Sequence, residues 1–227
     1  MSRSLYESPL LREITGDTLR PGGLEPTARA LEICAFPPGS RLLDAGCGVG
    51  GTLKFLQERG FSCLGVERRA DFAAEAAHHG PVLRADLTAM PVADAGFPGV
   101  FCECVLSLFA DKNAVLREFF RILVPRGKLI LTDLCSPQET GEVTRGPNGC
   151  AAGAVPLPAL KNILWENGFS VAFHEDYSRA LRELAARMAW QAGSVAAFMQ
   201  QAEIDSPCGC SGGLSYHLII AEKRRMP

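Results

Sequence analysis

The sequence lacks a long apolar run, a basic face and any strong excess of charge. Its 227 residues carry a formal charge of −2, and the one basic cluster, Lys223-Arg224-Arg225, lies next to the C-terminus. Nucleic-acid-binding domains usually present clustered basic residues, so we expect no nucleic-acid partner. No window reaches the ~20 apolar residues of a membrane span, and the first residues lack the apolar core of a signal peptide. We therefore expect a soluble, cytoplasmic protein with no membrane partner.

The cysteines lack the spacings that build a disulfide framework or a zinc site. There are 9 cysteines, an odd number, and several lie inside predicted strands and helices. No Cys-x-x-Cys pair occurs, which argues against a zinc site. We therefore expect reduced thiols and no bound metal.

What the sequence does contain is an alternation of short apolar runs with helical patterns, most regular over residues 41–134. This alternation is typical of βαβ units around a parallel sheet. The predicted strands are 41–44, 61–67, 82–87, 100–108, 129–134, 170–174 and 216–222. The predicted helices are 51–59, 71–79, 112–123 with Asp111 as its cap, 158–167, and one long helix over about 179–203. The expected fold is α/β, a Rossmann-like sheet of seven mostly parallel strands with helices on both faces.

The flanks of this pattern predict additions to the sheet. Residues 24–34 have apolar residues at helical spacing behind the turn RPGG at 20–23, so residues 1–40 are expected to form an N-terminal helical cap. The main domain would then span 41–227. Residues 135–155 are rich in Gly, Ser, Pro and Thr and are too long for a simple connection, so we expect either a lid loop or a partly disordered segment there.

The loop LLDAGCGVGG at 42–51 follows the first predicted strand and has the glycines of a ligand-binding turn. Such a loop can hold a dinucleotide, an ATP phosphate or the methionine end of S-adenosylmethionine. A Gly-x-Gly-x-x-Gly pattern can be extracted from it, but that match alone is weak. More informative are the acids that end three successive strands, Asp44, Glu67 and Asp86, because the carboxyl ends of parallel strands line one crevice. Three converging carboxylates disfavour a pyrophosphate and favour a cationic ligand.

These motifs resemble the class I S-adenosylmethionine-dependent methyltransferases. The matching segments are LLDAGCGVGG (42–51), GVE (65–67), ADL (85–87), VLSL (105–108) and LREFFRILVPRGKLILTDL (116–134). The resemblance implies that S-adenosylmethionine is the cofactor and that the reaction is an in-line methyl transfer. It also implies a set of cofactor-binding residues: Asp44, Ala45, Gly46, Gly48, Glu67, Arg68, Asp86, Leu87, Glu103 and Cys104.

The resemblance gives individual residues separate roles. The glycine loop would pass under the methionine end, with Asp44 oriented toward the ammonium group. Glu67 would accept both ribose hydroxyls, which are charge-assisted bonds, and Asp86 with Leu87 would contact the adenine. One departure concerns the turn before the fifth strand, where Arg126 replaces the residue that adopts positive φ in a type II turn. We therefore expect a different turn there.

Two Cys-x-Cys pairs, Cys102-Glu103-Cys104 and Cys208-Gly209-Cys210, form a second constellation. Residues i and i+2 of a strand share a face, so the first pair is expected to present its sulfurs together. The segment 101–123 resembles arsenite methyltransferases, and this resemblance implies a soft metalloid site at Cys104 with Cys150, Cys208 or Cys210. The competing interpretation is that these cysteines are buried packing residues.

The acceptor is less well defined by the sequence. The Asn/Asp-Pro-Pro-Tyr motif of amino-directed nucleic-acid methyltransferases is absent, which favours a small-molecule acceptor. The polar candidates for catalysis are Tyr6, Glu103, Cys104 and His174. Three hypotheses stay open: a small-molecule methyltransferase, a metalloid or thiol methyltransferase, and a non-catalytic domain that binds the cofactor.

Overall fold

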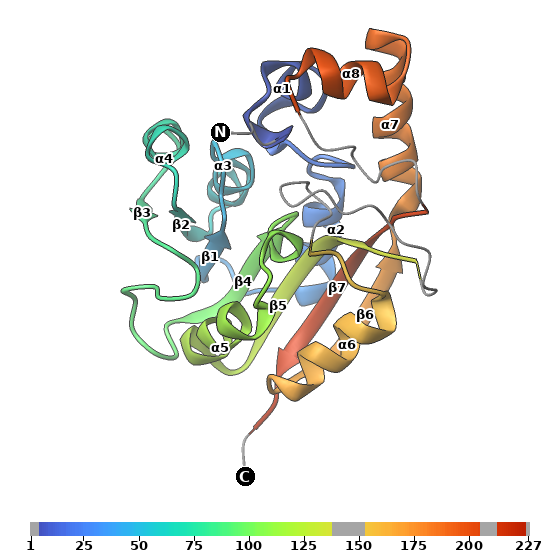
Figure 1. The fold of residues 1–227 in the computed structure, drawn as a ribbon. Coiled ribbons are helices and arrows are strands. Elements are labelled where there is room, and N and C mark those ends of the chain that lie inside the picture. Colours follow the sequence, from blue (N-terminus) through green and yellow to red (C-terminus); the bar gives the residue numbers. More distant parts are fainter. Residues whose placement is uncertain (1–4, 138–152, 205–212, 226–227) are drawn as a thin grey trace.

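The computed structural model describes residues 5–137, 153–204 and 213–225. In these residues one sheet has helices on both faces, and further helices lie over one of its ends (Figure 1). The strand order is β3-β2-β1-β4-β5-β7-β6. The strands are β1 (Arg41–Ala45), β2 (Ser62–Glu67), β3 (Val82–Arg84), β4 (Phe97–Glu103), β5 (Leu123–Cys135), β6 (Phe169–Asp176) and β7 (Ser215–Lys223).

The sheet is mostly parallel, as the sequence predicts. β1 pairs in parallel with β2 and β4, and the pairs β2 with β3 and β4 with β5 are also parallel. Among the strands of the described residues, only β7 runs antiparallel to its neighbours, β5 and β6. The order therefore reverses at β1 and β4, and ligands bind at the carboxyl ends of the strands at such a switch point.

Two apolar cores hold helices against the two faces of the sheet. The helices are α1 (Pro9–Thr15), α2 (Glu25–Cys34), α3 (Gly51–Glu58), α4 (Ala70–Ala76), α5 (Lys112–Ile122), α6 (Leu157–Glu166), α7 (Ser178–Ala192) and α8 (Val195–Gln201), with short 3₁₀ turns at η1 (Leu5–Glu7), η2 (Gly16–Thr18) and η3 (Leu106–Leu108). One core joins α2 and α3 to β1 and β7 through Leu53 and Leu56. The other joins α5 and α6 to β4 and β5 through Phe119 and Leu164. As predicted, Asp111 caps α5, accepting from the backbone N–H groups of Asn113 and Ala114.

A third apolar cluster lies outside these cores and contains the first helices of the predicted N-terminal helical segment, whereas α2, which was predicted to belong to the same segment, packs on the face of the sheet. The cluster packs α1 and the residues around it against α7 and α8 (Figure 1), with Leu11, Leu181 and Phe198 among its buried members. Gly51 shows how closely the N-terminal residues approach the start of α3. A Cβ added there would lie 2.7 Å from the backbone oxygen of Asp17. We call this cluster the cap. None of the helices in the described ranges is long and apolar enough to cross a membrane.

Several predicted elements differ from the structure. The fifth strand begins at Leu123 instead of residue 129, and the second helix ends at Ala76 instead of residue 79. The third strand ends at Arg84 instead of residue 87, and the fourth ends at Glu103 instead of residue 108. The chain leaves the sheet there because Cys104 has a left-handed backbone (φ 60°) and a 3₁₀ turn follows. The long helix predicted over 179–203 is two helices, because Gly193 ends α7 at φ 86° and the Ser194 side chain caps α8.

The prediction for the turn at Arg126 was wrong. Arg126 adopts φ 64°, so an arginine takes the positive-φ position that the sequence argument reserved for glycine. Its guanidinium bonds to Glu222 of β7 at 3.1 Å, an interaction that favours this conformation. Left-handed backbone at a non-glycine residue costs about 1–2 kcal/mol.

Candidate active site

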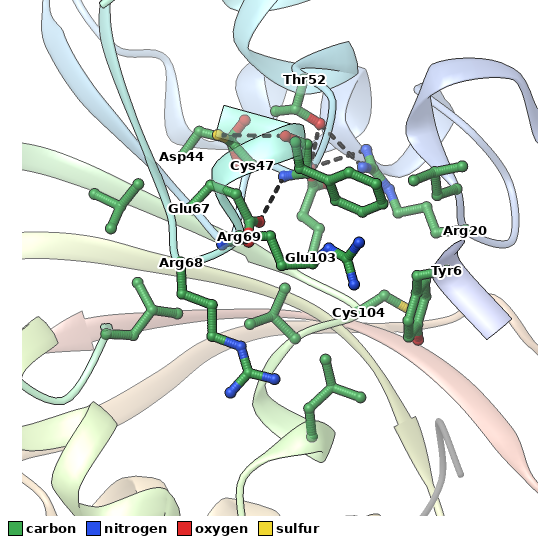
Figure 2. Close-up of a pocket in the computed structure, with 18 of the residues that line it drawn as sticks. Tyr6, Arg20, Asp44, Cys47, Thr52, Glu67, Arg68, Arg69, Glu103 and Cys104 are labelled. Atoms are coloured by element: carbon green, nitrogen blue, oxygen red, sulfur yellow. Dashed lines mark hydrogen bonds and ion pairs between the residues drawn. The ribbon is translucent and has the colours of Figure 1, made fainter. Parts of the chain in front are cut away.

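A pocket lies at the carboxyl ends of β1, β2 and β4, where the sheet order reverses, and the cap covers it (Figure 2). Ala85 and Leu87, after β3, contribute to its walls, and the other walls come from four parts of the chain. They are the glycine loop after β1, the end of β2 with the residues that follow, the segment after β4, and the N-terminal residues around Tyr6 and Arg20. The sequence places the first three together because parallel strands share one edge. The covering N-terminal residues come from tertiary packing.

The glycine loop forms the floor of this pocket. The N–H groups of Gly46 and Cys47 both donate to the backbone oxygen of Val66, at 2.8 and 3.1 Å, so the loop turns tightly across the end of β2. Gly46 has φ 74°, and a Cβ there would lie 2.6 Å from a methyl group of Val105. At Gly48, also at positive φ, an added Cβ would meet only Leu19 at 4.0 Å. Gly48 therefore presents bare backbone to the pocket.

Glu67 stands at the end of β2 with its carboxylate in the pocket wall. Its two oxygens accept backbone bonds from Gly48 at 3.1 Å and from Arg69 at 2.8 Å. These bonds hold the carboxylate beside the glycine loop, and the residue keeps 9% of its surface exposed. Two oxygens in a fixed orientation suit a ligand with two adjacent hydroxyl groups.

Asp44 ends β1 beneath the glycine loop and is buried. Burial is the main cause that raises its pKa from 3.8 to about 8, and the nearby carboxylates of Glu103 and Glu67 add to the effect, while Arg20 opposes it. One carboxylate oxygen, Oδ2, has no hydrogen-bond partner. A buried acceptor without a donor is costly, so this atom is suited to receive a donor from a bound cation.

Glu103, at the end of β4, is engaged in a buried network. Its carboxylate accepts from the hydroxyls of Thr27 at 2.8 Å and Thr52 at 2.7 Å, and it pairs with Arg20 at 2.9 Å. Arg20 in turn donates to the same two hydroxyls. Figure 2 shows Arg20, Thr52 and Glu103 of this network. Through these bonds Glu103 holds the N-terminal segment against the sheet. The sequence analysis, which named Glu103 as a candidate for catalysis, did not predict this structural role.

Cys102 and Cys104 lie in different surroundings, so the expectation of a paired presentation was wrong. Cys102 packs in the core beneath α5, whereas Cys104 packs in the cap. The left-handed backbone of Cys104 turns the chain out of the strand alternation on which the expectation rested. Cys104 lines the pocket beside Tyr6 (Figure 2). The proposed partners Cys150, Cys208 and Cys210 lie outside the described residues. None of the six described cysteines forms a disulfide.

Two other predicted residues are turned away from the pocket. The carboxylate of Asp86 accepts from the backbone and the hydroxyl of Thr88, at 2.9 and 2.7 Å, while Leu87 and Arg68 do line the pocket. His174 lies at the far edge of the sheet on β6, where its Nε2 is 3.0 Å from His217 Nδ1. His174 is therefore removed from the candidates for catalysis. Ala45 is buried in the sheet core and does not line the pocket.

Ion pairs across the pocket rim were not visible in the sequence. Glu7 pairs with Arg69, and both line the pocket. Arg12 of α1 bonds to Glu75 of α4, and also to Asp17 at 2.7 Å. These contacts join residues from distant parts of the chain, so no local pattern announces them. They tie the cap to the β2 side of the pocket.

The comparisons with known proteins agree with this geometry. Residues 43–131, which include the glycine loop and the ends of β1, β2 and β4, match the family described as a methyltransferase domain. This part of the chain is a methyltransferase domain of the class I S-adenosylmethionine-dependent type. S-adenosylmethionine is therefore the cofactor of this methyltransferase domain.

Proteins with similar sequences are named for different methyl acceptors. The chain is 29% identical to phosphoethanolamine N-methyltransferase 3 of Arabidopsis thaliana, over 71% of this chain and 32% of that protein. It is 27% identical to an arsenite methyltransferase of Aquipseudomonas alcaligenes, over 60% of this chain and 46% of that protein. The chain thus spans less than half of these curated relatives.

A solved structure shows the same fold. The phosphoethanolamine N-methyltransferase 2 of Haemonchus contortus, in complex with S-adenosyl-L-methionine, superposes with a TM-score of 0.75. The match covers 97% of this chain and 57% of that chain, at 19% identity. At that identity the likeness concerns the fold and leaves the acceptor open.

The residues of the pocket fit S-adenosylmethionine. The buried Asp44 oxygen without a donor suits an ammonium group, and Glu67 suits the ribose hydroxyls. Gly48 leaves room for close approach of the ligand to the backbone. The sulfonium is cationic, and the acids that line the pocket outnumber its arginines: Glu7, Asp17, Asp44, Glu67 and Glu103 against Arg20, Arg68 and Arg69.

Proposed function

We propose that the protein transfers a methyl group from S-adenosylmethionine to a small-molecule acceptor. The observation that carries the proposal is the convergence of Asp44, Glu67 and the bare backbone of Gly48 on one covered pocket. When bound, the cofactor supplies an electrophilic methyl group on a cationic sulfur. A dinucleotide would bring a pyrophosphate to the same carboxylates, which disfavours that alternative.

In such a reaction the protein mainly has to align the cofactor with the acceptor and to exclude water from the reacting atoms. Glu67 and Asp44 would orient the two ends of the cofactor, and the cap excludes water from the space around Tyr6 and Cys104. Glu103 is held by three donors, so it is poorly placed to take a proton from an acceptor. We therefore assign it a positioning role.

A ligand-stabilisation experiment tests cofactor binding. The protein is melted with S-adenosylhomocysteine, NAD and ATP in parallel, and only the first is expected to raise the melting temperature. A ligand at 100 times its Kd adds about 2.7 kcal/mol of stability. Glu67→Ala should abolish the shift, while Glu58→Ala, on the exposed face of α3, should keep it. Stabilisation by NAD instead would overturn the assignment.

Turnover separates an enzyme from a domain that only binds the cofactor. The protein is incubated with methyl-labelled donor and a pool of small metabolites, and transfer of label supports catalysis. Binding of S-adenosylhomocysteine without any transfer across the pool would favour the non-catalytic hypothesis.

A second candidate, a metalloid or thiol methyltransferase, is favoured by one observation: Cys104 lines the pocket directly after β4. The relatives include a protein named as an arsenite methyltransferase. Cys150, Cys208 and Cys210 would have to complete a thiolate site. If methylation of arsenite by Cys104→Ser proceeds at the wild-type rate, this candidate is removed.

A further inference from the structure

The chain just before Arg20 lies against the glycine loop of the pocket. A Cβ added to Gly51 would lie 2.7 Å from the backbone oxygen of Asp17. A Cβ added to Gly48 would lie 4.0 Å from the side chain of Leu19. Arg20 follows directly and lines the pocket. It therefore lies at the end of the pocket that the glycine loop forms, which is the end that suits the methionine part of the cofactor.

The guanidinium of Arg20 is held in place but keeps one donor without a partner. It donates to the hydroxyls of Thr52 at 3.0 Å and Thr27 at 2.7 Å, and it pairs with Glu103 at 2.9 Å. Figure 2 shows Arg20 reaching toward Thr52 and Glu103. Only 5% of the side chain is exposed, and its Nε has no hydrogen-bond partner among the described residues. A buried donor without an acceptor is costly, so this guanidinium is suited to receive an anion.

Asp44 offers the complementary group in the same pocket, a buried carboxylate oxygen without a donor. Burial and Glu103 raise the pKa of Asp44, and Arg20 opposes them, so the three charged groups lie within electrostatic reach of one another. One donor and one acceptor, both buried and both without partners, suit a ligand that carries an anion and a cation close together. The amino-acid end of S-adenosylmethionine, with its carboxylate and its ammonium group, is such a ligand.

The other cations of the pocket are committed elsewhere. Among the described residues that line it, these are Arg68 and Arg69, both directly after β2. Arg69 pairs with Glu7, and the charge of Arg68 acts on Asp86, which follows β3. Acids outnumber arginines in the walls, so a carboxylate that enters this pocket needs a cation beside it. At the glycine loop that cation is Arg20.

We propose that Arg20 binds the carboxylate of S-adenosylmethionine while Asp44 binds its ammonium group. The inference rests on the proposed function and adds to it a residue that determines which ligands bind. The charges would then alternate in the order Asp44, ammonium, carboxylate, Arg20 and Glu103, so that each has an opposite charge next to it. Glu103 becomes the residue that positions Arg20. Because Arg20 belongs to the N-terminal segment, the bound carboxylate would also hold that segment over the pocket.

The test compares three ligands by isothermal titration calorimetry. They are S-adenosylhomocysteine, its aminopropyl analogue, in which hydrogen replaces the carboxylate, and its carboxypropyl analogue, in which hydrogen replaces the ammonium group. The wild-type protein should bind the aminopropyl analogue about tenfold to a hundredfold more weakly than S-adenosylhomocysteine, which corresponds to one hydrogen bond between charged groups. Equal affinities would overturn the proposal. Failure of S-adenosylhomocysteine itself to bind would refute the proposed function instead.

Two variants should exchange the ligands that they discriminate. Arg20→Met should weaken S-adenosylhomocysteine and the carboxypropyl analogue about tenfold or more and leave the affinity for the aminopropyl analogue unchanged. Asp44→Asn should weaken S-adenosylhomocysteine and the aminopropyl analogue and leave the carboxypropyl analogue unchanged. If Arg20 only holds the fold together, Arg20→Met will weaken all three ligands alike, and that result would overturn the proposal.

A double variant separates this contact from the charge that Arg20→Met leaves behind on Glu103. Arg20→Met combined with Glu103→Gln leaves neither charge buried alone, so it should be more stable than Arg20→Met. It should bind S-adenosylhomocysteine and the aminopropyl analogue with equal affinity. If it keeps the wild-type preference for S-adenosylhomocysteine, the proposal is wrong. The matched control is Arg29→Met on α2, whose side chain is 43% exposed and pairs with Glu32 and Glu175. This control should keep the wild-type order of the three affinities.

Discussion

Glu103→Ala should destabilise the protein strongly, because the substitution leaves a buried arginine without its partner. The side chains of Arg20 and Glu103 are 5% and 2% exposed and lie 2.9 Å apart. Removing one partner of such a pair costs about 3–5 kcal/mol, mostly through the charge that stays behind. The hydroxyls of Thr27 and Thr52 also lose an acceptor. This loss is a large fraction of a typical domain stability of about 5–15 kcal/mol.

The measurement is urea unfolding at equilibrium, followed by circular dichroism, for Glu103→Ala, Arg20→Met and the double variant. Replacing both partners by apolar side chains is often close to neutral, so the double variant should be more stable than the sum of the two single losses predicts. The matched control is Glu58→Ala, which breaks a pair with Lys54 whose side chains are 60% and 53% exposed. That exposed pair should contribute less than about 1 kcal/mol.

Two results would refute this reasoning. If Glu103→Ala lowers the free energy of unfolding by less than about 1 kcal/mol, water or a neighbouring group must compensate the charge of Arg20. Such a loss is far below the cost expected for breaking a buried ion pair. Strict additivity in the double variant would show that the two side chains do not interact energetically. Either result would also reopen a direct role for Glu103 in the reaction.

Three further predictions concern the pocket and its rim. The pKa of Asp44 is raised from 3.8 to about 8, so between these pH values the ligand-free native state holds a proton that the unfolded chain releases. The contribution of Asp44 to the free energy of unfolding therefore falls as pH rises through this range. Asp44→Asn should flatten this fall in urea titrations and weaken S-adenosylhomocysteine binding in calorimetry; an unchanged pH profile would contradict the assignment. Gly46→Ala should cost at least about 1–2 kcal/mol from positive φ, plus the clash with Val105, and a variant as stable as wild type in thermal melts would argue against the tight turn. Glu75→Gln, which removes the charge that faces Arg12, should accelerate association of S-adenosylhomocysteine in stopped flow. Raised salt should accelerate association more in the wild type than in the variant, which keeps only the rim pair of Glu7 with Arg69, since screening weakens exposed pairs; identical salt dependence in both proteins would show that the Arg12–Glu75 pair does not limit access.

The sequence predicted the elements of the sheet because their signals are local. The apolar runs and helical spacings placed β1, α3 and α5 within a residue of their observed ends. The failures came where tertiary contacts decide the backbone. Arg126 accepts positive φ while bonded to Glu222, a residue 96 positions away. Likewise, the left-handed backbone of Cys104 ended β4 early and separated its sulfur from that of Cys102.

The sequence by itself determined the fold class and the edge of the sheet at which the candidate pocket lies. A glycine loop after one strand, with acids at the ends of neighbouring strands, must gather at one crevice because parallel strands all end on the same side. Only the tertiary structure decided what covers that crevice. The pairing of Arg20 with Glu103, the rim pair of Glu7 with Arg69 and the apolar contact of α1 with α7 join residues far apart in the chain. Their geometry follows from the packing of the cap. The spacing of apolar residues predicts that a face of each helix is buried, but it does not predict which part of the chain that face contacts.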